Sequence, residues 1–304
     1  MKVNLICCLI LLACLSFSSL AQQTSKMSPA GTGYLEYVPA DYNSNSNQYP
    51  IVISLHGISE KGNTLNDLNK VDNVSLAKYV KNGTQYPFII ISPQLKTSMG
   101  TWTGAYVMEV LNHVKTYLRI DQNRIYLTGL SLGGGGVWAV STAYPDVFAA
   151  IIPICSGYNL TSKACKIAEY NIPVWAFHGD ADAVVSHNVT VNMINAINNC
   201  SPKPSPLAKL TIFPGVGHNA WDKVFLQTDV LNWMLGYRKQ SLDSQIPIEI
   251  DPVANAGPNK TITLPTNSLS ISGSGSGSIT SYLWRKKSGG AVTMSGATSP
   301  ILKV

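Results

Sequence analysis

Residues 124–140, RIYLTGLSLGGGGVWAV, contain the turn around which the rest of the sequence is organised. An apolar, strand-like segment runs directly into Gly129-Leu130-Ser131-Leu132-Gly133, and a glycine-rich helix start follows. A strand and a helix joined by Gly-x-Ser-x-Gly place the serine on a sharp turn, where small neighbours let the backbone bend and leave the hydroxyl accessible. The pentapeptide alone arises by chance in about one chain of this size in ten, but the flanking strand and helix strengthen it. We therefore predict that Ser131 is a nucleophile.

The segments on either side of this turn alternate between strand-like and helix-like patterns. Continuous apolar runs such as 51–55 are typical of parallel strands that are buried on both faces. We therefore expect a doubly wound α/β domain with a mostly parallel sheet over residues 22–239. The expected strands are 34–38, 51–55, 88–91, 124–128, 149–154, 173–177 and 209–213, and the expected helices are 105–118, 131–144, 187–197 and 223–235.

The N-terminal residues 1–21 have the pattern of a signal peptide. Lys2 precedes an apolar stretch over 5–15, and Ser19-Leu20-Ala21 is a small-x-small cleavage site. The apolar stretch is too short to cross about 30 Å of hydrocarbon as a helix, so no membrane span is expected. A lipoprotein is the alternative, because Leu11-Leu12-Ala13-Cys14 resembles an acylation box. We expect an exported protein that is secreted, periplasmic or held at the cell surface.

The C-terminal part changes character at residue 240. Residues 240–252 have no periodic pattern and are interpreted as a linker. Residues 253–304 are rich in Ser, Thr and Gly with short β-prone runs, which indicates the opening strands of an immunoglobulin-like β-sandwich. Such a sandwich needs about 80 to 100 residues, so we expect this module to be incomplete.

Composition and cysteine usage narrow the class of protein. The chain has 304 residues, of which 45% are hydrophobic and 12% charged, and its formal net charge is +6. It contains no run of five basic residues and no basic stripe interleaved with aromatic residues, so we expect no nucleic-acid partner. Of the cysteines beyond the leader, Cys155 ends a buried-looking strand, whereas Cys165 and Cys200 lie in polar segments next to helices. We predict a disulfide between Cys165 and Cys200.

A serine nucleophile needs a histidine base, which in this architecture follows the serine and an acid in the chain. His218 lies in the glycine-bracketed segment 214–221, PGVGHNAW, where a catalytic base is expected. His187 opens a polar helix and is interpreted as a surface residue. We predict that His218 is the base.

Two carboxylates can supply the acid, because strand 173–177 continues into His178-Gly179-Asp180-Ala181-Asp182. We predict Asp182 as the partner of His218, with Asp180 closing the turn through backbone amides, although either residue fits this pattern. Asp222 is a third possibility that is more typical of a helix cap.

Acyl transfer also needs backbone donors for the developing oxyanion. The amide of Leu132 follows the nucleophile, and the amide of Ile58 lies in the loop after strand 51–55, so we predict these two donors. His56 is interpreted as a turn histidine bonded to backbone. No ligand spacing indicates a metal, and no cofactor is expected.

Aromatic residues that can line a substrate pocket are Trp102, Trp138 and Trp221, although such tryptophans are more often part of a core.

On these residues, the segment 31–237 resembles a family of secreted α/β-hydrolases often labelled predicted peptidases, which is related to polyhydroxybutyrate-depolymerase-like and feruloyl or acetyl esterases. The resemblance implies that the acid of a His-Gly-x-x-Asp-x-x-Val pattern falls on Asp182. Similar proteins often carry a small residue at the position of Ile58, where the larger isoleucine side chain is expected to narrow the acyl pocket. The C-terminal segment resembles PKD-type sandwich modules of exported bacterial enzymes. The marks of the family lie in 55–57, 60–62, 92–94, Trp102, 124–133, 153–157, 173–179 with Asp182 and Val185, and 217–218 with Trp221.

These observations predict a secreted serine esterase that acts on small-molecule or polysaccharide esters through an acyl-enzyme on Ser131. A serine peptidase of the prolyl-oligopeptidase-like type is an alternative with the same residues, but it needs an extended subsite for a chain and a protonated amine leaving group. A catalytically inactive binding protein that is carried by the β-module is the second alternative. The predicted order of serine, acid and histidine argues for an enzyme.

Overall fold

The computed structural model describes residues 23–239 and, nearer the C-terminus, 253–255, 270–272, 274–276, 293 and 301–303. The predicted signal peptide (1–21), the linker (240–252) and most of the predicted β-module lie outside the described residues. Among the described residues, the C-terminal part contains two antiparallel pairs, β9 (Val253–Asn255) with β11 (Ser274–Ser276) and β10 (Ser270–Ser272) with β12 (Ile301–Lys303).

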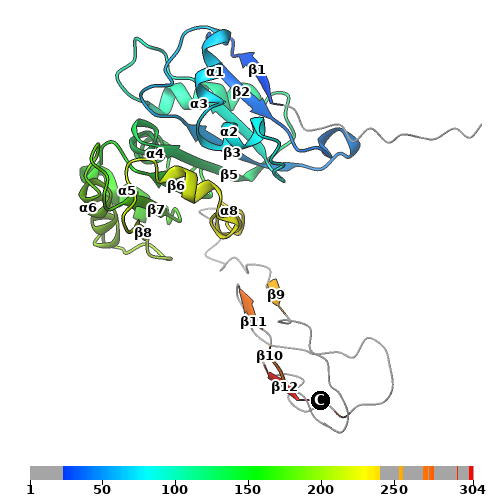
Figure 1. Cartoon of the computed structure of the whole chain (residues 1–304), viewed down its shortest axis with the longest axis vertical. Coiled ribbons are helices and arrows are strands. Elements are labelled where there is room, and N and C mark those ends of the chain that lie inside the picture. The colour runs from blue at the N-terminus through cyan, green and yellow to red at the C-terminus, as the bar shows by residue number, and fades with distance from the viewer. Residues whose placement is uncertain are drawn as a thin grey trace, which may run out of the picture.

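An eight-stranded sheet in the order β1-β2-β4-β3-β5-β6-β7-β8 forms the centre of the described N-terminal part (Figure 1). The pairs from β4 through β3 and β5 to β8 are parallel, whereas β1 and β2 are antiparallel to their neighbours. The strands are β1 (Thr24–Met27), β2 (Gly33–Tyr37), β3 (Tyr49–Leu55), β4 (Ile89–Pro93), β5 (Ile120–Leu130), β6 (Ala150–Ile154), β7 (Trp175–Gly179) and β8 (Lys209–Phe213). The expected doubly wound, mostly parallel sheet is confirmed.

Helices cover both faces of this sheet, because side chains alternate along each buried strand. In β5, Ile125 and Leu127 pack in one hydrophobic cluster with α3, α4, α5 and α6, and Tyr126 packs in the other with α2, α7 and α8. The helices are α1 (Leu68–Val71), α2 (Ser75–Lys81), α3 (Gly104–Val114), α4 (Leu132–Ala143), α5 (Ala164–Glu169), α6 (Asn188–Asn198), α7 (Trp221–Phe225) and α8 (Thr228–Leu235), with 3-10 turns at Tyr42–Ser44, Leu65–Asp67 and Thr161–Lys163.

The structure corrects several expected elements. The single helix expected over 223–235 is two helices, because Gln227 has extended backbone angles (φ −90°, ψ 108°) between α7 and α8. Strand β1 was not expected, since its sequence TSKM is polar and it lies at the exposed edge of the sheet, where apolar periodicity is absent. The helices α2 and α5 were not expected either, because they are too short to show a clear helical period.

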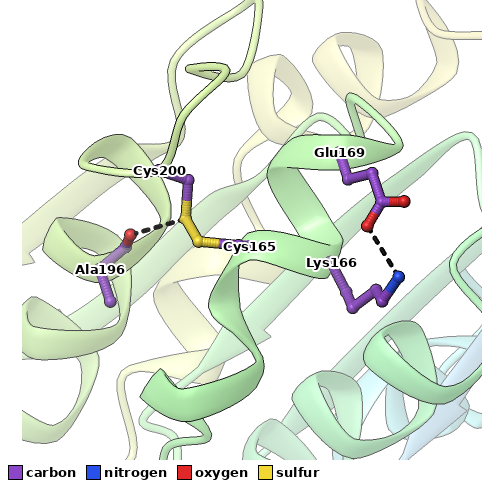
Figure 2. The surroundings of a disulfide bond; sticks show 5 residues. All are labelled: Cys165, Lys166, Glu169, Ala196 and Cys200. Atoms are coloured by element: carbon purple, nitrogen blue, oxygen red, sulfur yellow. Dashed lines mark hydrogen bonds and ion pairs between the residues drawn. A yellow bond between two sulfur atoms is a disulfide. The ribbon is translucent and has the colours of Figure 1, made fainter.

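A disulfide joins Cys165 of α5 to Cys200, which follows α6 (Figure 2). The two α-carbons are 5.4 Å apart and the bridge spans 35 residues of sequence. Cys155 is a free, buried cysteine. The predicted pairing is confirmed.

No helix in the described ranges is both long enough and apolar enough to cross a bilayer.

Candidate active site

Ser131 occupies a strained turn between β5 and α4. Its backbone angles are φ 54° and ψ −117°, a region that residues other than glycine rarely adopt and that often marks a functional position. The turn lies against neighbouring backbone, so that a Cβ on Gly133 would overlap the carbonyl oxygen of Leu55. The Ser131 amide donates to the Ile154 oxygen at 3.0 Å, which ties the turn to β6. The strand, sharp turn and helix predicted around Ser131 are all present.

His218 lies beside this serine, in the loop between β8 and α7. Its Nε2 is 2.9 Å from Ser131 Oγ, and its Nδ1 is 2.7 Å from Asp182 Oδ2. The His218 side chain is 19% exposed, and its ring packs edge-on against Trp221 with centroids 5.4 Å apart. This arrangement lets Nδ1–H donate to the carboxylate while Nε2 accepts the serine proton.

The Asp182 carboxylate is fully buried and held by several donors. Its Oδ1 accepts hydrogen bonds from the amides of Val184 and Val185, each at 2.9 Å. Burial by itself raises the pKa of Asp182, but the hydrogen bonds from these amides and from His218 hold the pKa below its ordinary value. Asp182 therefore remains ionised beside His218.

The two other candidate acids lie elsewhere. Asp180 is exposed and accepts a hydrogen bond from the Gly215 amide at 2.7 Å, which is the turn role expected of it. Asp222 Oδ1 is bound by Lys78 Nζ at 2.9 Å and by the Tyr79 hydroxyl at 2.8 Å. Of the three carboxylates, the structure brings only Asp182 into contact with His218.

The predicted oxyanion donors, the amides of Leu132 and Ile58, belong to two segments next to Ser131. Leu132 is the first residue of α4, so its amide has no acceptor within the helix. The loop that carries Ile58 approaches Ser131 closely, because a Cβ on Gly57 would lie 3.6 Å from Ser131 Cβ. Within residues 23–239, neither the Leu132 nor the Ile58 amide donates to a protein acceptor. Each amide therefore has a hydrogen that no protein acceptor in this range takes.

His56 holds the Ile58 loop in place. Its Nδ1 lies 2.6 Å from the Gly57 oxygen, and its Nε2 accepts from the Leu95 amide at 2.9 Å. Burial lowers the pKa of His56 to about 4, so the ring is neutral at pH 7. The expected role as a turn histidine bonded to backbone is confirmed.

Trp102 and Trp138 lie in the core, whereas Trp221 lies beside His218. Trp102 is only 1% exposed, and its Nε1 donates to the His56 oxygen at 3.2 Å. Trp138 is completely buried and donates to Ser156 Oγ at 2.9 Å. The prediction that Trp102 lines a substrate pocket is therefore wrong, because its ring is covered by the core and by His56. Trp221 is partly buried and contacts His218.

Ligand atoms of Cys155, Asp182 and His218 lie within 4.8 Å of one another, so their spacing alone is compatible with a metal ion. Their chemistry argues against one. Burial raises the pKa of the Cys155 thiol to about 12, and metals bind the thiolate. Asp182 and His218 are already engaged with each other.

Two known proteins are related in sequence to part of this chain. A bifunctional acetylxylan esterase/xylanase of Neocallimastix patriciarum is 25% identical over 198 residues, covering 61% of this chain and 26% of that protein. A probable feruloyl esterase C of Aspergillus niger is 23% identical over 198 residues, covering 64% of this chain and 69% of that protein. The chain thus spans about a quarter of the first relative and about two thirds of the second.

A solved structure of an esterase has a similar fold. The crystal structure of a thermostable esterase superposes with a TM-score of 0.57 and 24% identity, covering 73% of this chain and 64% of that one. A PKD-domain profile matches residues 256–304, in agreement with the module expected there. The profile of the dienelactone hydrolase family matches residues 33–223, more than half of the sequence and the part that contains Ser131, Asp182 and His218. The chain therefore belongs to the dienelactone hydrolase family.

Proposed function

We propose that the protein is an exported serine esterase in which Ser131, His218 and Asp182 form the catalytic triad. The observation that carries this proposal is the continuous contact from Ser131 Oγ to His218 Nε2 at 2.9 Å and from His218 Nδ1 to Asp182 Oδ2 at 2.7 Å. A hydroxyl, an imidazole and a buried carboxylate in this order are the parts needed for nucleophilic attack on a carbonyl. The membership of the chain in a hydrolase family supports the same conclusion.

In the proposed reaction, His218 Nε2 takes the Ser131 proton as the oxygen attacks the ester carbonyl. The amides of Leu132 and Ile58 stabilise the negative oxygen of the tetrahedral intermediate. His218 then returns the proton to the leaving alcohol, and an acyl-enzyme remains on Ser131. Water attacks this ester with His218 again acting as the base, which releases the acid and restores the serine.

We propose that the substrate is an ester of a carboxylic acid with a carbohydrate or a small alcohol. The names of the acetylxylan and feruloyl esterases among the relatives support this class. Two exposed apolar side chains suit contact with an acyl group. Ile58, 62% exposed, belongs to the oxyanion loop, and Val184, 72% exposed, is two residues from Asp182.

A substrate panel tests the proposal. Purified protein is assayed with p-nitrophenyl acetate, methyl ferulate, acetylated xylan and a peptide anilide. Hydrolysis of at least one ester and none of the anilide is expected, and Ser131→Ala and His218→Ala abolish it. His187→Ala is the matched control, because His187 lies at the start of α6 and outside the contact chain. Cleavage of the anilide in preference to every ester, or undiminished ester hydrolysis by Ser131→Ala, contradicts the proposal.

A further inference from the structure

We infer that His178 is a positioning residue that fixes the Asp182 carboxylate and thereby sets how strongly that carboxylate supports His218. The inference rests on the proposed function, since it concerns the efficiency of the same triad. In the sequence, His178 is the histidine of the His-Gly-x-x-Asp-x-x-Val pattern at the end of a strand, with no role of its own.

His178 is a completely buried residue near the end of β7. Its Nε2 is 2.9 Å from Asp182 Oδ2 and 3.1 Å from the Val185 carbonyl oxygen. Its Nδ1 is 2.8 Å from the hydroxyl oxygen of Thr190, a buried residue of α6. The ring therefore connects α6 to the loop that carries the acid.

The partners determine the tautomer of His178. A carboxylate and a carbonyl are acceptors only, so Nε2 must carry the hydrogen that both share. Burial keeps the pKa of His178 below its ordinary value despite the nearby Asp182, which leaves the ring neutral and Nδ1 an acceptor. The Thr190 hydroxyl, which can rotate, donates to Nδ1 and fixes this tautomer.

As a result, each oxygen of the Asp182 carboxylate accepts two hydrogen bonds. Two imidazole N–H groups, from His178 and His218, bind Oδ2, and the amides of Val184 and Val185 bind Oδ1. The carboxylate cannot rotate without breaking a buried hydrogen bond. In addition, His178 donates a hydrogen bond to Oδ2, the same oxygen that accepts from His218. This bond reduces the negative charge available at Oδ2, so Asp182 stabilises protonated His218 less strongly. The titratable groups that face His178 are Asp182 and His218, and the neutral Cys155 thiol lies beside Asp182.

Two substitutions of His178 separate this role from simple filling of the core. The amide nitrogen of glutamine can stand near the position of Nε2, whereas that of asparagine reaches only the position of Nδ1. We expect His178→Asn to lower kcat for p-nitrophenyl acetate about ten-fold, the usual size of one lost buried hydrogen bond, with little change in KM. The acid limb of its pH profile moves to higher pH by about half a unit, because Asp182 holds a proton on His218 more tightly. His178→Gln restores most of the activity and the wild-type profile.

A second pair of variants tests how firmly α6 holds the ring, without changing the histidine. In Thr190→Val the Asp182 carboxylate and the Val185 oxygen still require the hydrogen on Nε2, but the buried Nδ1 loses its donor, so the ring and its hydrogen bond to Asp182 are held less firmly. Thr190→Val removes the hydroxyl and should lower kcat with the same direction of pH shift, whereas Thr190→Ser keeps the hydroxyl and should behave as wild type. This pair also decides the question if His178→Asn does not fold. Equal kcat and pH profiles for Thr190→Val and wild type, or for His178→Asn and wild type, overturn the inference. A wild-type protein that hydrolyses no ester contradicts the proposed function instead, so the two failures are distinguishable.

Discussion

Replacing Asp182 by asparagine is expected to disable the site through a mismatch of hydrogen-bond donors. Each carboxylate oxygen accepts from two N–H groups, Oδ1 from the amides of Val184 and Val185, and Oδ2 from His178 and His218. An asparagine has only one oxygen. Whichever way its amide is turned, its NH₂ group faces two N–H donors, so one pair of hydrogen bonds is replaced by donor–donor contacts.

The losses of stability and of kcat depend on which pair of donors the NH₂ group of the asparagine faces. Leaving a buried donor unsatisfied costs about 1–3 kcal/mol, so two such donors reduce the free energy of unfolding by about 2–6 kcal/mol. If the NH₂ group faces His218, the ring must move its hydrogen to Nε2 and can no longer accept the Ser131 proton. A wrong tautomer of the catalytic histidine lowers kcat by about 10⁴-fold, which corresponds to about 5.5 kcal/mol of transition-state stabilisation.

The assay compares Asp182→Asn with Asp180→Asn, using kcat for p-nitrophenyl acetate and denaturant unfolding followed by fluorescence. Asp180→Asn should stay within about three-fold of wild type, because the exposed Asp180 carboxylate binds only the Gly215 amide and one exposed hydrogen bond contributes about 0.5–1 kcal/mol. A much larger loss of activity from Asp180→Asn, or an Asp182→Asn protein with more than a tenth of the wild-type kcat, refutes the reasoning.

Two further predictions concern stability. Removing the disulfide with Cys165→Ser and Cys200→Ser should reduce the free energy of unfolding by about 4 kcal/mol, because the bridge closes a loop of 35 residues. Denaturant unfolding of the double variant, with wild type as control, measures this, and a loss below about 1 kcal/mol would speak against a bridge that constrains the unfolded chain. The pH dependence of stability should reflect His56, whose pKa is lowered from 6.5 to about 4 in the folded state. As the pH falls below 6.5 the unfolded chain takes up a proton that the folded chain refuses, so unfolding at pH 5 should cost about 2 kcal/mol less than at pH 8. Equal stability at both pH values contradicts this.

The central part of the fold could be predicted from the sequence, because buried parallel strands are continuous apolar runs. The run at 51–55 and the strand before Ser131 needed no tertiary information to be recognised. Edge strand β1 escaped because its polar residues have no periodicity, and the break between α7 and α8 escaped because Gln227 carries no helix-breaking signal.

In the candidate site too, some residues have a local sequence signature and others are identified only by their tertiary contacts. The turn at Ser131 and the loop at His218 have local signatures, whereas the choice between Asp180 and Asp182 depends on how the loop after β7 returns toward β8. The sequence left both carboxylates possible. The burial of Trp102 and the contact between His178 and Asp182 are tertiary facts without a local pattern. The spacing of a histidine and an aspartate at i and i+4 after a strand was the only available signal for the latter.

The central claim is that Ser131 is an activated nucleophile, and covalent labelling tests it most directly. Folded protein is treated with a fluorophosphonate probe and digested, and the modified peptide is identified by mass spectrometry. The account predicts a single adduct on Ser131, its absence in Ser131→Ala, and labelling in His218→Ala that is slower by orders of magnitude. Folded wild-type protein that forms no adduct, or that is labelled on another serine while Ser131 stays unmodified, would contradict it.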